Sequence, residues 1–319
     1  MRFKLLNNKE GEPLSDDNLA KIPTFLIEML QNQYGENLTK EIIEGYTADR
    51  PVTFRVNTLK TDASTIEKIL DKQGIIYEKV SYDKNAFIIK NERENAIKNL
   101  DIYKNGEIYL QSLSSMLPPI ILNPQKGADI LDMAAAPGGK TTQVAALSEN
   151  KANITACEMN IVRAERLKYN IEKQGATCAY VMVTDARRID DFFSFDQILL
   201  DAPCSGSGTL SIKGSDITQK FTQKFIDKLI SSQKALLKKA ITILKPGKEM
   251  IYSTCSILSC ENEEIIDEVL PRNQAEIVPI EFKGIEQLPL LPSRIAGTIC
   301  VCPTERYEGF FIAKIRKKW

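Results

Sequence analysis

The stretch that decides the fold is residues 130–141, which read ILDMAAAPGGKT. An apolar run ends at Leu131, the acid Asp132 follows it, and a series of small residues comes next. A helical pattern then resumes from Thr141. This order predicts a strand, a tight turn and a helix N-terminus, the geometry in which an α/β protein presents backbone N–H groups to a ligand.

Two familiar phosphate-binding loops are excluded at this turn. A P-loop needs four residues between its first Gly and its Gly-Lys-[Ser/Thr] end, and the segment PGGKT at 137–141 lacks that leading Gly. The dinucleotide pattern G-x-G-x-x-G is absent from it as well. Taken alone, the turn supports a nucleotide-like ligand, with a purely structural strand–Gly–helix turn as an equal alternative.

The composition limits the classes of protein and of chemistry. At 319 residues, the chain has room for two domains, or for one large α/β domain with an appendage. Its 42 Lys and Arg residues balance 42 Asp and Glu residues, so any nucleic-acid surface must be a local basic patch. The chain contains no His, which removes the usual general base and the commonest metal ligand.

The cysteines and the lack of a targeting segment point to one compartment. Seven Cys are scattered over a chain whose N-terminus, MRFKLLNNKEG, shows no hydrophobic leader. No apolar run approaches the roughly 18–20 residues of a membrane span. We expect a reduced, cytoplasmic protein without membrane contact, whose cysteines are buried or catalytic. The pairs Cys255/Cys260 and Cys300/Cys302 lack metal-ligand spacing, so no metal is expected.

Hydrophobic periodicity divides the chain into three parts: an N-terminal helical arm (1–48), a small α+β domain (49–115) and a larger domain (116–319). The arm is predicted to hold helices over 18–34 and 38–46. The small domain is predicted as a strand, a helix and two strands, at 51–60, 62–73, 75–80 and 86–90. That order indicates a ferredoxin-like or RNA-recognition (RRM-like) unit, although the aromatic signature of an RNA-binding sheet face is missing.

In the larger domain, strands and helices alternate along the chain. Strands are predicted over 130–132, 153–158, 179–183, 197–201, 249–253 and 309–317, and helices over 140–147, 162–174, 221–244 and 261–269. Regular alternation at this spacing predicts a doubly wound, mostly parallel, Rossmann-like α/β sheet. Ligands of such sheets bind at the carboxyl ends of the strands.

Five successive predicted strands end in an acid or a thiol. In chain order these residues are Asp132, Glu158, Asp185, Asp201 with Cys204, and Cys255. Glu158 is placed to accept hydrogen bonds from ribose hydroxyls, and Asp185 to meet an adenine edge. Any one of these residues taken singly is more often a surface acid or a core thiol, but the ordered set favours a binding site.

Two of the seven thiols differ from the others. Cys204 and Cys255 lie at strand exits among small polar residues, whereas the thiols in or beside apolar strands are interpreted as inert packing: Cys157, Cys178, Cys300 and Cys302.

A thiolate beside a methyl donor can act as a nucleophile in the methylation of cytosine. Its addition to C6 of cytosine turns C5 into a carbon that attacks an electrophilic methyl group, and elimination then restores the ring. Such a site also needs an acid near N3 and a base for the C5 proton.

Four motifs in order now carry a resemblance to a known family. They are residues 132–141, Glu158 with Arg163, DAPCSG at 201–206, and YSTCSILSCENEE at 252–264. Over residues 50–317 the chain resembles the RNA 5-methylcytosine methyltransferases of the RsmB/RsmF (Nop2/Sun) family, and the closing EGFFIA at 308–313 also matches. The resemblance implies methyl transfer from S-adenosyl-L-methionine to C5 of a cytosine in rRNA or tRNA, through a covalent Cys–C6 adduct.

The resemblance implies catalytic roles for three residues, and the need for a thiolate suggests a fourth. Cys255 would attack C6, and Cys204 would assist release of the covalent protein–RNA adduct. Asp201 would contact the methyl-donor end and the target base. Because the chain has no His, a thiolate must be favoured by dipoles, by the sulfonium charge of the cofactor, or by a cation such as Lys140.

The resemblance also implies how the cofactor is held. The residues that would wrap its methionine and ribose are Ala134, Ala135, Ala136, Pro137, Gly138, Gly139 and Lys140. Glu158 would bind the ribose hydroxyls, Asp185 the adenine edge, and Arg163 would help to hold that region. Two positions depart from the pattern: Ala134 stands where members commonly have Cys, and Cys260 replaces a common Pro and is expected to be a buried structural thiol.

The substrate should be an unpaired or extruded cytosine, because a helix hides C5 and C6. Candidates for phosphate contacts are Arg55, Lys60, Lys213, Lys220 and Lys224. A monomer is expected, since no heptad pattern stands out.

Three rival functions stay open. The principal one is a non-catalytic RNA-binding ribosome-assembly factor on the same fold, and retention of both motif thiols argues against it. A methyltransferase acting on an exocyclic amine usually shows an Asn/Asp-Pro-Pro-aromatic loop, whereas this chain has DAPC at 201–204. DNA as the substrate is disfavoured only by the resemblance.

Overall fold

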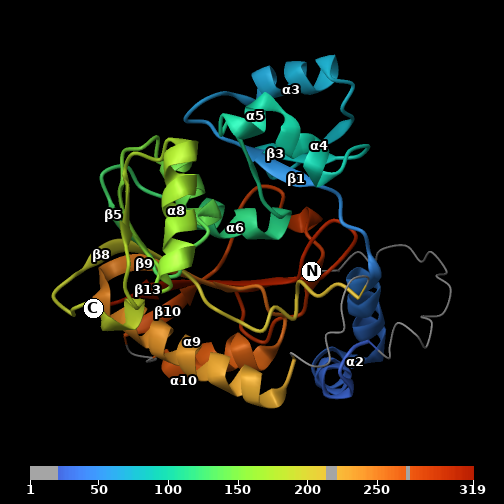
Figure 1. Cartoon of the computed structure of the whole chain (residues 1–319). Coiled ribbons are helices and arrows are strands. Elements are labelled where there is room, and N and C mark those ends of the chain that lie inside the picture. Colours follow the sequence, from blue (N-terminus) through green and yellow to red (C-terminus); the bar gives the residue numbers. More distant parts are fainter. Residues whose placement is uncertain (1–20, 213–220, 271–273) are drawn as a thin grey trace.

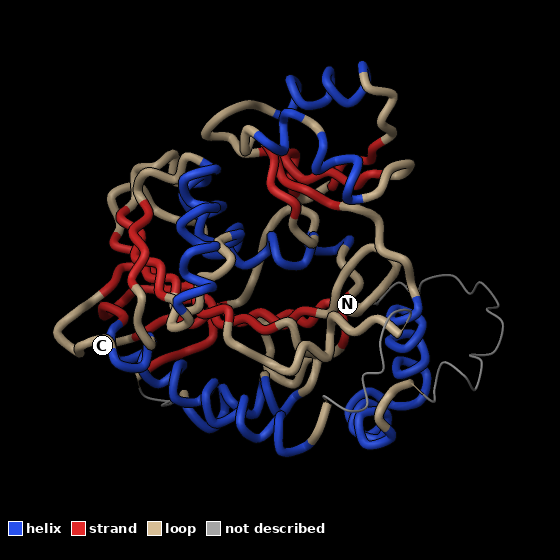
Figure 2. Tube along the Cα trace, viewed as in Figure 1, coloured by secondary structure: helices blue, strands red, loops and turns tan. Residues whose placement is uncertain are grey.

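The computed structural model describes residues 21–212, 221–270 and 274–319. It contains two β-sheets, a small one of four strands and a large one of nine strands, with helices packed around them (Figures 1 and 2). None of the helices within the described ranges is long and apolar enough to cross a membrane.

The small unit is an antiparallel sheet in the order β2-β3-β1-β4. Its strands are β1 (Thr53–Val56), β2 (Tyr77–Val80), β3 (Asp83–Ile89) and β4 (Ile108–Leu110). Helix α3 (Ala63–Lys72) begins after Asp62, whose carboxylate accepts a hydrogen bond from the Thr65 N–H at 3.0 Å. The rings of Phe54 and Phe87 stack at 5.3 Å in the core. The predicted strand–helix–strand–strand order of this unit is confirmed.

The end of the small unit was not predicted. After β3 come two short helices, α4 (Glu94–Asn99) and α5 (Asp101–Lys104), and then β4, which completes the sheet beside β1. Helix α6 (Leu113–Leu122) follows and leads to the large sheet. Three residues of β4 are too few to show alternation, so the sequence carried no signal for this strand. The domain boundaries at 48 and 115 stay predictions.

The large sheet has the order β11-β12-β13-β9-β8-β5-β6-β7, and β10 pairs with β13. Its strands are β5 (Asp129–Asp132), β6 (Asn153–Cys157), β7 (Ala179–Met182), β8 (Phe195–Asp201), β9 (Leu244–Thr254), β10 (Ala275–Val278), β11 (Leu290–Leu291), β12 (Ile299–Val301) and β13 (Phe310–Lys317). Strands β5 to β9 pair in parallel, as predicted. The pairs around β13 are antiparallel, and β10, β11 and β12 were missed because each has only two to four residues.

Helices cover both faces of the large sheet, which makes it doubly wound. Helix α9 (Gln223–Ile243) and α10 (Glu263–Val269) pack on one face, where their apolar residues join one core cluster. Helix α6, α7 (Gly139–Leu147) and α8 (Ile161–Gln174) pack on the other face and contribute to a second cluster. Figure 1 shows α9 and α10 on the side of the sheet opposite to α6 and α8. The predicted fold class is confirmed.

Helix α2 (Thr24–Thr47) joins the two predicted helices of the N-terminal arm into one kinked element. Gly35 lies at the kink with a φ of 75°, a conformation that glycine adopts without strain. The helix packs into the core of the large sheet, because Leu26, Leu30 and Ile42 are buried in its first cluster. The first three residues of the predicted helix over 18–34 lie outside the described residues.

Arg55 joins the small unit to the large one. This β1 residue is 2% exposed, and its guanidinium donates hydrogen bonds to the Gln111 Oε1 at 2.9 Å, the Gly139 carbonyl at 3.0 Å and the Thr142 Oγ1 at 2.8 Å. Burial lowers its pKa to about 10. The expectation that Arg55 contacts RNA phosphate is therefore wrong: the side chain points inward and fastens β1 to the start of α7.

Replacing Arg55 should destabilise the protein. In Arg55→Met, one buried and two half-buried acceptors lose their donor, and we expect the free energy of unfolding to fall by about 2–4 kcal/mol in urea denaturation. Lys224→Met, which removes an exposed cation at the start of α9, is the matched control and should change it by less than about 0.5 kcal/mol. A loss at Arg55 no larger than the control would contradict the inward role.

Candidate active site

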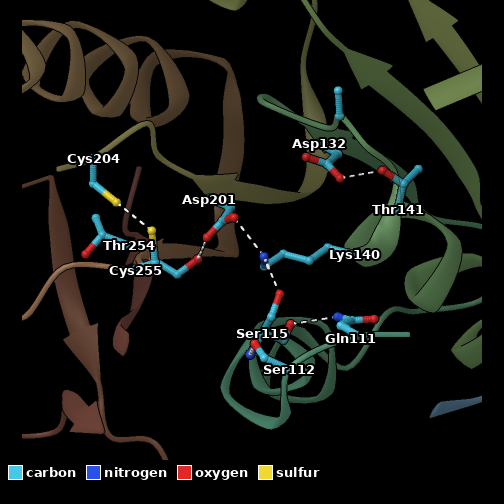
Figure 3. Close-up of polar contacts among 12 residues, drawn as sticks. Gln111, Ser112, Ser115, Asp132, Lys140, Thr141, Asp201, Cys204, Thr254 and Cys255 are labelled. Atoms are coloured by element: carbon cyan, nitrogen blue, oxygen red, sulfur yellow. Dashed lines mark hydrogen bonds and ion pairs between the residues drawn. The ribbon is translucent and has the colours of Figure 1, made fainter. Parts of the chain in front are cut away.

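The carboxyl edge of the parallel strands brings five predicted site residues together. Asp132 ends β5, Asp201 ends β8, and Cys255 follows β9. Lys140 reaches into this group from the first turn of α7, and Cys204 from the loop after β8 (Figure 3). Residues separated by more than 120 positions in the sequence thus meet because neighbouring parallel strands end at the same edge.

The turn between β5 and α7 follows the predicted strand–turn–helix order. Gly138 has a φ of 108°, and a Cβ there would lie 3.0 Å from the Leu167 side chain. A Cβ on Gly139 would lie 3.1 Å from the ring of Tyr109, so both glycines fit where a larger residue would be crowded. Helix α8 holds the turn: Arg163 donates to the Ala136 carbonyl at 2.9 Å, and Asn170 donates to the Pro137 carbonyl at 2.8 Å.

Asp132 is a buried carboxyl group beneath that turn. Its Oδ2 accepts a hydrogen bond from the Thr141 Oγ1 at 2.7 Å, which ties the end of β5 to the start of α7. Burial raises the pKa of Asp132 to about 6, and the nearby charge of Asp201 acts in the same direction. The Thr141 hydrogen bond and the charge of Lys140 lower that pKa in part.

Lys140 and Asp201 form an ion pair at the centre of the group. The Lys140 Nζ lies 2.7 Å from the Asp201 Oδ2, donates to the Ser115 Oγ at 2.7 Å, and lies over the Phe310 ring at 5.3 Å. The Ser253 Oγ donates to the other Asp201 oxygen at 2.8 Å. Burial is the largest single effect and would lower the pKa of Lys140, but the charge and hydrogen bond of Asp201, with the charges of Cys255 and Asp132, together outweigh it and the pKa is raised. The side chain is therefore a fixed cation.

Two thiols face each other beside this ion pair. The Sγ atoms of Cys204 and Cys255 are 3.0 Å apart, and both side chains are half-buried (Figure 3). The pairing of β8 with β9 sets this contact, because Asp201 lies beside Ser253 in the register. The hydrogen bond with Cys255 and burial raise the pKa of Cys204 well above its usual range, and the charge of Glu261 adds to the effect.

The other five cysteines are set apart from this pair. Cys157, Cys178, Cys300 and Cys302 are buried, as predicted for packing residues. Cys260, which was expected to be buried, is half-buried. Burial raises the pKa of Cys157 and of Cys260 to about 12. Reactivity at neutral pH is disfavoured at such thiols.

A second group of predicted residues lies at the ends of β6 and β7. Glu158 is 3% exposed, accepts from the Asn160 N–H at 2.8 Å, and pairs with Arg163 at 3.4 Å. Asp185 accepts four hydrogen bonds from Arg187, which lower the pKa of its carboxyl group. Several apolar side chains between the two acids in the sequence are exposed to solvent, among them Met159, Ile161, Val162 and Val183.

The candidates for phosphate contacts beyond Arg55 are placed differently. The Lys60 Nζ donates to the carbonyls of Asn105 and Lys173, at 2.8 and 2.7 Å, so it braces the loop after β1. Lys224 is exposed at the start of α9. Lys213 and Lys220 lie outside the described residues. Within the described ranges, no group of three or more Cys, Asp or Glu side chains could hold a metal ion.

Sequence reasoning missed the residues that support the site. Ser115 binds Lys140 from α6, and Tyr46 of α2 donates to the Ser207 carbonyl at 2.6 Å. Glu261 and Asn262 contact the two thiol loops, and the motif at 252–264 contains both, although the pattern alone assigned them no role. No sequence signal marked Ser115 or Tyr46, because their partners lie 25 and 161 positions away.

This fold and this site define a Rossmann-like methyltransferase preceded by a small α+β unit. Residues 119–316 match the family model described as 16S rRNA methyltransferase RsmB/F. Residues 22–95 match the ferredoxin-like domain of RsmF/B-like methyltransferases, a match that includes α2. The chain belongs to the RsmB/F methyltransferase family, as the sequence motifs indicated.

Named relatives and solved structures agree with that family. The chain is 34% identical over 281 residues to ribosomal RNA small subunit methyltransferase F of Shewanella piezotolerans, covering 83% of this chain and 57% of the relative. It is 33% identical to the 28S rRNA (cytosine-C(5))-methyltransferase of Mus musculus, covering 92% of this chain and 38% of that protein. The chain thus spans about half the length of these relatives.

Among solved structures, a methyltransferase homologue from Pyrococcus horikoshii has a TM-score of 0.81 and 31% identity, covering 96% of this chain and 100% of that chain. NSun6 from the same organism, solved with SFG, an S-adenosylmethionine analogue, has a TM-score of 0.81 at 23% identity and covers 92% and 98%. The second likeness concerns the fold alone.

The raised pKa of Asp132 predicts a pH-dependent stability. Its folded-state pKa of about 6 exceeds the ordinary value of about 3.8, so the stability that it contributes is present below pH 4 and is lost as the pH rises through 6. The Asn side chain of Asp132→Asn carries no charge. At pH 7 the free energy of unfolding of this variant should exceed that of the unaltered protein by about 1–3 kcal/mol, and at pH 4 the two should not differ in this way.

Urea denaturation between pH 4 and 8 measures this difference. In Thr141→Val, which removes the hydrogen bond that lowers the Asp132 pKa, the pH-dependent loss should extend to higher pH. A gain in Asp132→Asn that is the same at every pH would contradict the assignment.

Proposed function

We propose that this chain transfers a methyl group from S-adenosyl-L-methionine to C5 of a cytosine in RNA, through a covalent adduct between Cys255 and C6. The observation that carries the proposal is the pair of thiols 3.0 Å apart beside the Lys140–Asp201 ion pair, at the carboxyl edge of the sheet. Family membership and the printed names of the relatives support the reaction and the ribosomal RNA substrate.

The residues around the β5–α7 turn fit an adenosyl cofactor. The turn leads through two glycines into the N-terminus of α7, and the Glu158 carboxylate lies beyond it with an oxygen suited to ribose hydroxyls. The exposed apolar side chains of Ile161 and Val162 suit one face of an aromatic base, with Asp185 near its edge as proposed from the sequence. When bound, S-adenosylmethionine supplies an electrophilic methyl group. The segment 134–140, Arg163 and Asp201 would hold it.

Cys255 is the proposed nucleophile. Its thiolate adds to C6 of cytosine, and the electron pair of the C5=C6 bond becomes available at C5 for bond formation to the methyl group. The Lys140 cation interacts electrostatically with the Cys255 thiol. After methylation, loss of the C5 proton and cleavage of the Sγ–C6 bond restore the ring and the thiolate.

Cys204 and Asp201 have different proposed tasks. The hydrogen bond with Cys255, burial and the charge of Glu261 raise the pKa of Cys204, so its proton is held firmly and the attack on C6 is assigned to Cys255. After it has lost its own proton to solvent, the Cys204 thiolate accepts the C5 proton and becomes a neutral thiol, which assists release of the adduct. Asp201 is held by Lys140 and Ser253, and from this fixed position its carboxylate can meet the N3 side of the base.

The proposed substrate is ribosomal RNA rather than transfer RNA, because the names of the relatives refer to ribosomal RNA. The proposed location is the cytoplasm. A monomer remains the predicted state. A non-catalytic assembly factor is the rival, and it would have no use for a fixed lysine cation beside two paired thiols.

Methyl transfer from labelled cofactor into RNA, run beside denaturing gels, tests the proposal. We expect no 5-methylcytosine from Cys255→Ala, and an RNA-linked, gel-stable protein band from Cys204→Ala, because the adduct forms there but is not released. Cys178→Ala removes a buried thiol from the opposite part of the sheet and should retain activity.

Two results would reject it. Full 5-methylcytosine formation by Cys255→Ala would show that the thiol assignment is wrong. An unaltered protein that binds RNA without transferring a methyl group would favour the assembly factor.

A further inference from the structure

Two adjacent polar side chains are completely buried behind the thiols. Glu261 ends the 3₁₀ turn Ser259–Glu261, and Asn262 separates that turn from α10. Both side chains are 0% exposed, which is costly for a carboxylate and an amide unless their hydrogen bonds are satisfied. Their partners lie in two different loops.

Glu261 holds the loop of Cys204. Its two carboxylate oxygens accept hydrogen bonds from the Ser205 N–H at 2.8 Å and the Ser205 Oγ at 2.5 Å. Gln233 of α9 donates to the same carboxylate at 3.3 Å and to the Pro203 carbonyl at 3.0 Å. The residues on both sides of Cys204 are therefore fixed through this one carboxylate and its amide partner.

Asn262 holds the loop of Cys255 in the same manner. Its Oδ1 accepts from the Thr254 Oγ1 at 2.6 Å, and its Nδ2 donates to the Ser256 carbonyl at 2.9 Å. The residues on both sides of Cys255 are fixed by a single amide. The two loops are also linked directly: the Gly208 N–H donates to the Cys255 carbonyl at 2.9 Å, the Ile257 N–H donates to the Ser207 Oγ at 3.0 Å, and the hydroxyls of Ser207 and Ser256 lie 2.8 Å apart.

Consecutive Cα atoms are about 3.8 Å apart, so neighbouring residues that each hold one loop also fix the spacing between the loops. We propose that Glu261 and Asn262 are positioning residues that act on separate steps. Asn262 sets Cys255 for addition to C6, and Glu261 sets Cys204 for release of the adduct. This inference rests on the proposed two-thiol reaction and deepens it.

The charge of Glu261 predicts a change in the pH dependence of adduct release, which a change in packing alone would not cause. The titratable groups that face Cys204 are Cys255, Glu261 and Tyr252. Because the Glu261 carboxylate raises the pKa of Cys204, its removal in Glu261→Gln lowers that pKa. The rise of the adduct-release rate with pH, which follows the ionisation of Cys204, should then occur at lower pH. The Gln side chain keeps nearly the shape of the Glu side chain that it replaces.

The test follows the two steps separately. Adduct formation is timed in the Cys204→Ala background, where release is blocked. Adding Asn262→Asp keeps the acceptor for Thr254 but sets an oxygen against the Ser256 carbonyl, and we expect formation to slow about tenfold or more. In a protein with both thiols, the misplacement of Cys204 in Glu261→Gln should outweigh the gain from its lower pKa, so this variant should accumulate the gel-stable adduct, and Asn262→Asp should not.

Glu264→Gln is the matched control, because the same change falls on an exposed carboxylate three residues further along the motif. It should accumulate no adduct and leave the rate of methyl transfer unaltered. Where a variant at 261 or 262 melts early, Ser205→Ala and Thr254→Val each remove one hydrogen bond to these side chains from the loop side, the Ser205 Oγ bond to Glu261 and the Thr254 Oγ1 bond to Asn262. They should reproduce the release defect and the formation defect, respectively.

The outcomes separate this inference from the proposed function. If the unaltered protein forms no 5-methylcytosine and Cys204→Ala traps no adduct, the proposed function fails. If both behave as expected but Glu261→Gln and Asn262→Asp impair both steps alike, or impair neither, the division of labour between the two residues is overturned.

Discussion

The ion pair between Lys140 and Asp201 is the interaction on which the site depends. It connects the first turn of α7 to the end of β8, and through Ser115 it also reaches α6. The two side chains are only 14% and 27% exposed, so loss of either partner would leave a poorly solvated charge beside the thiols. The same cation interacts electrostatically with Cys255, so the ion pair that stabilises this edge of the sheet also acts on one of the two thiols.

The rest of the chain supports this edge from several sides. The small sheet reaches it through Arg55, which binds the start of α7, and α2 reaches it through Tyr46 and Tyr34, whose hydroxyls bind the carbonyls of Ser207 and Ile257. Helix α2 and the small sheet lie apart in Figure 1. The small sheet supports the loop that follows β5, and α2 supports the loops that follow β8 and β9. Precise placement of reacting groups requires such support, because a small displacement is costly in rate.

The sequence predicted the framework of the site well, and the reasons are physical. Residues 130–141 show a change from an apolar strand to glycines and a helix, and this local signal located α7 and the acids at the strand ends. What could not be predicted depends on distant contacts. Arg55 has the sequence context of a half-exposed strand, and only packing of the small sheet on α7 buries it. Likewise β11, with two residues, exists only because β12 pairs with it.

The central claim is that Cys255, and not Cys204, bonds to the target base. RNA that contains 5-fluorocytidine tests it directly in the unaltered protein, because fluorine at C5 replaces the proton whose loss permits release. Mass spectrometry of the trapped complex after proteolysis identifies the modified peptide. The account predicts a methylated 5-fluorocytidine attached to the peptide that contains Cys255. Attachment at Cys204 would contradict it.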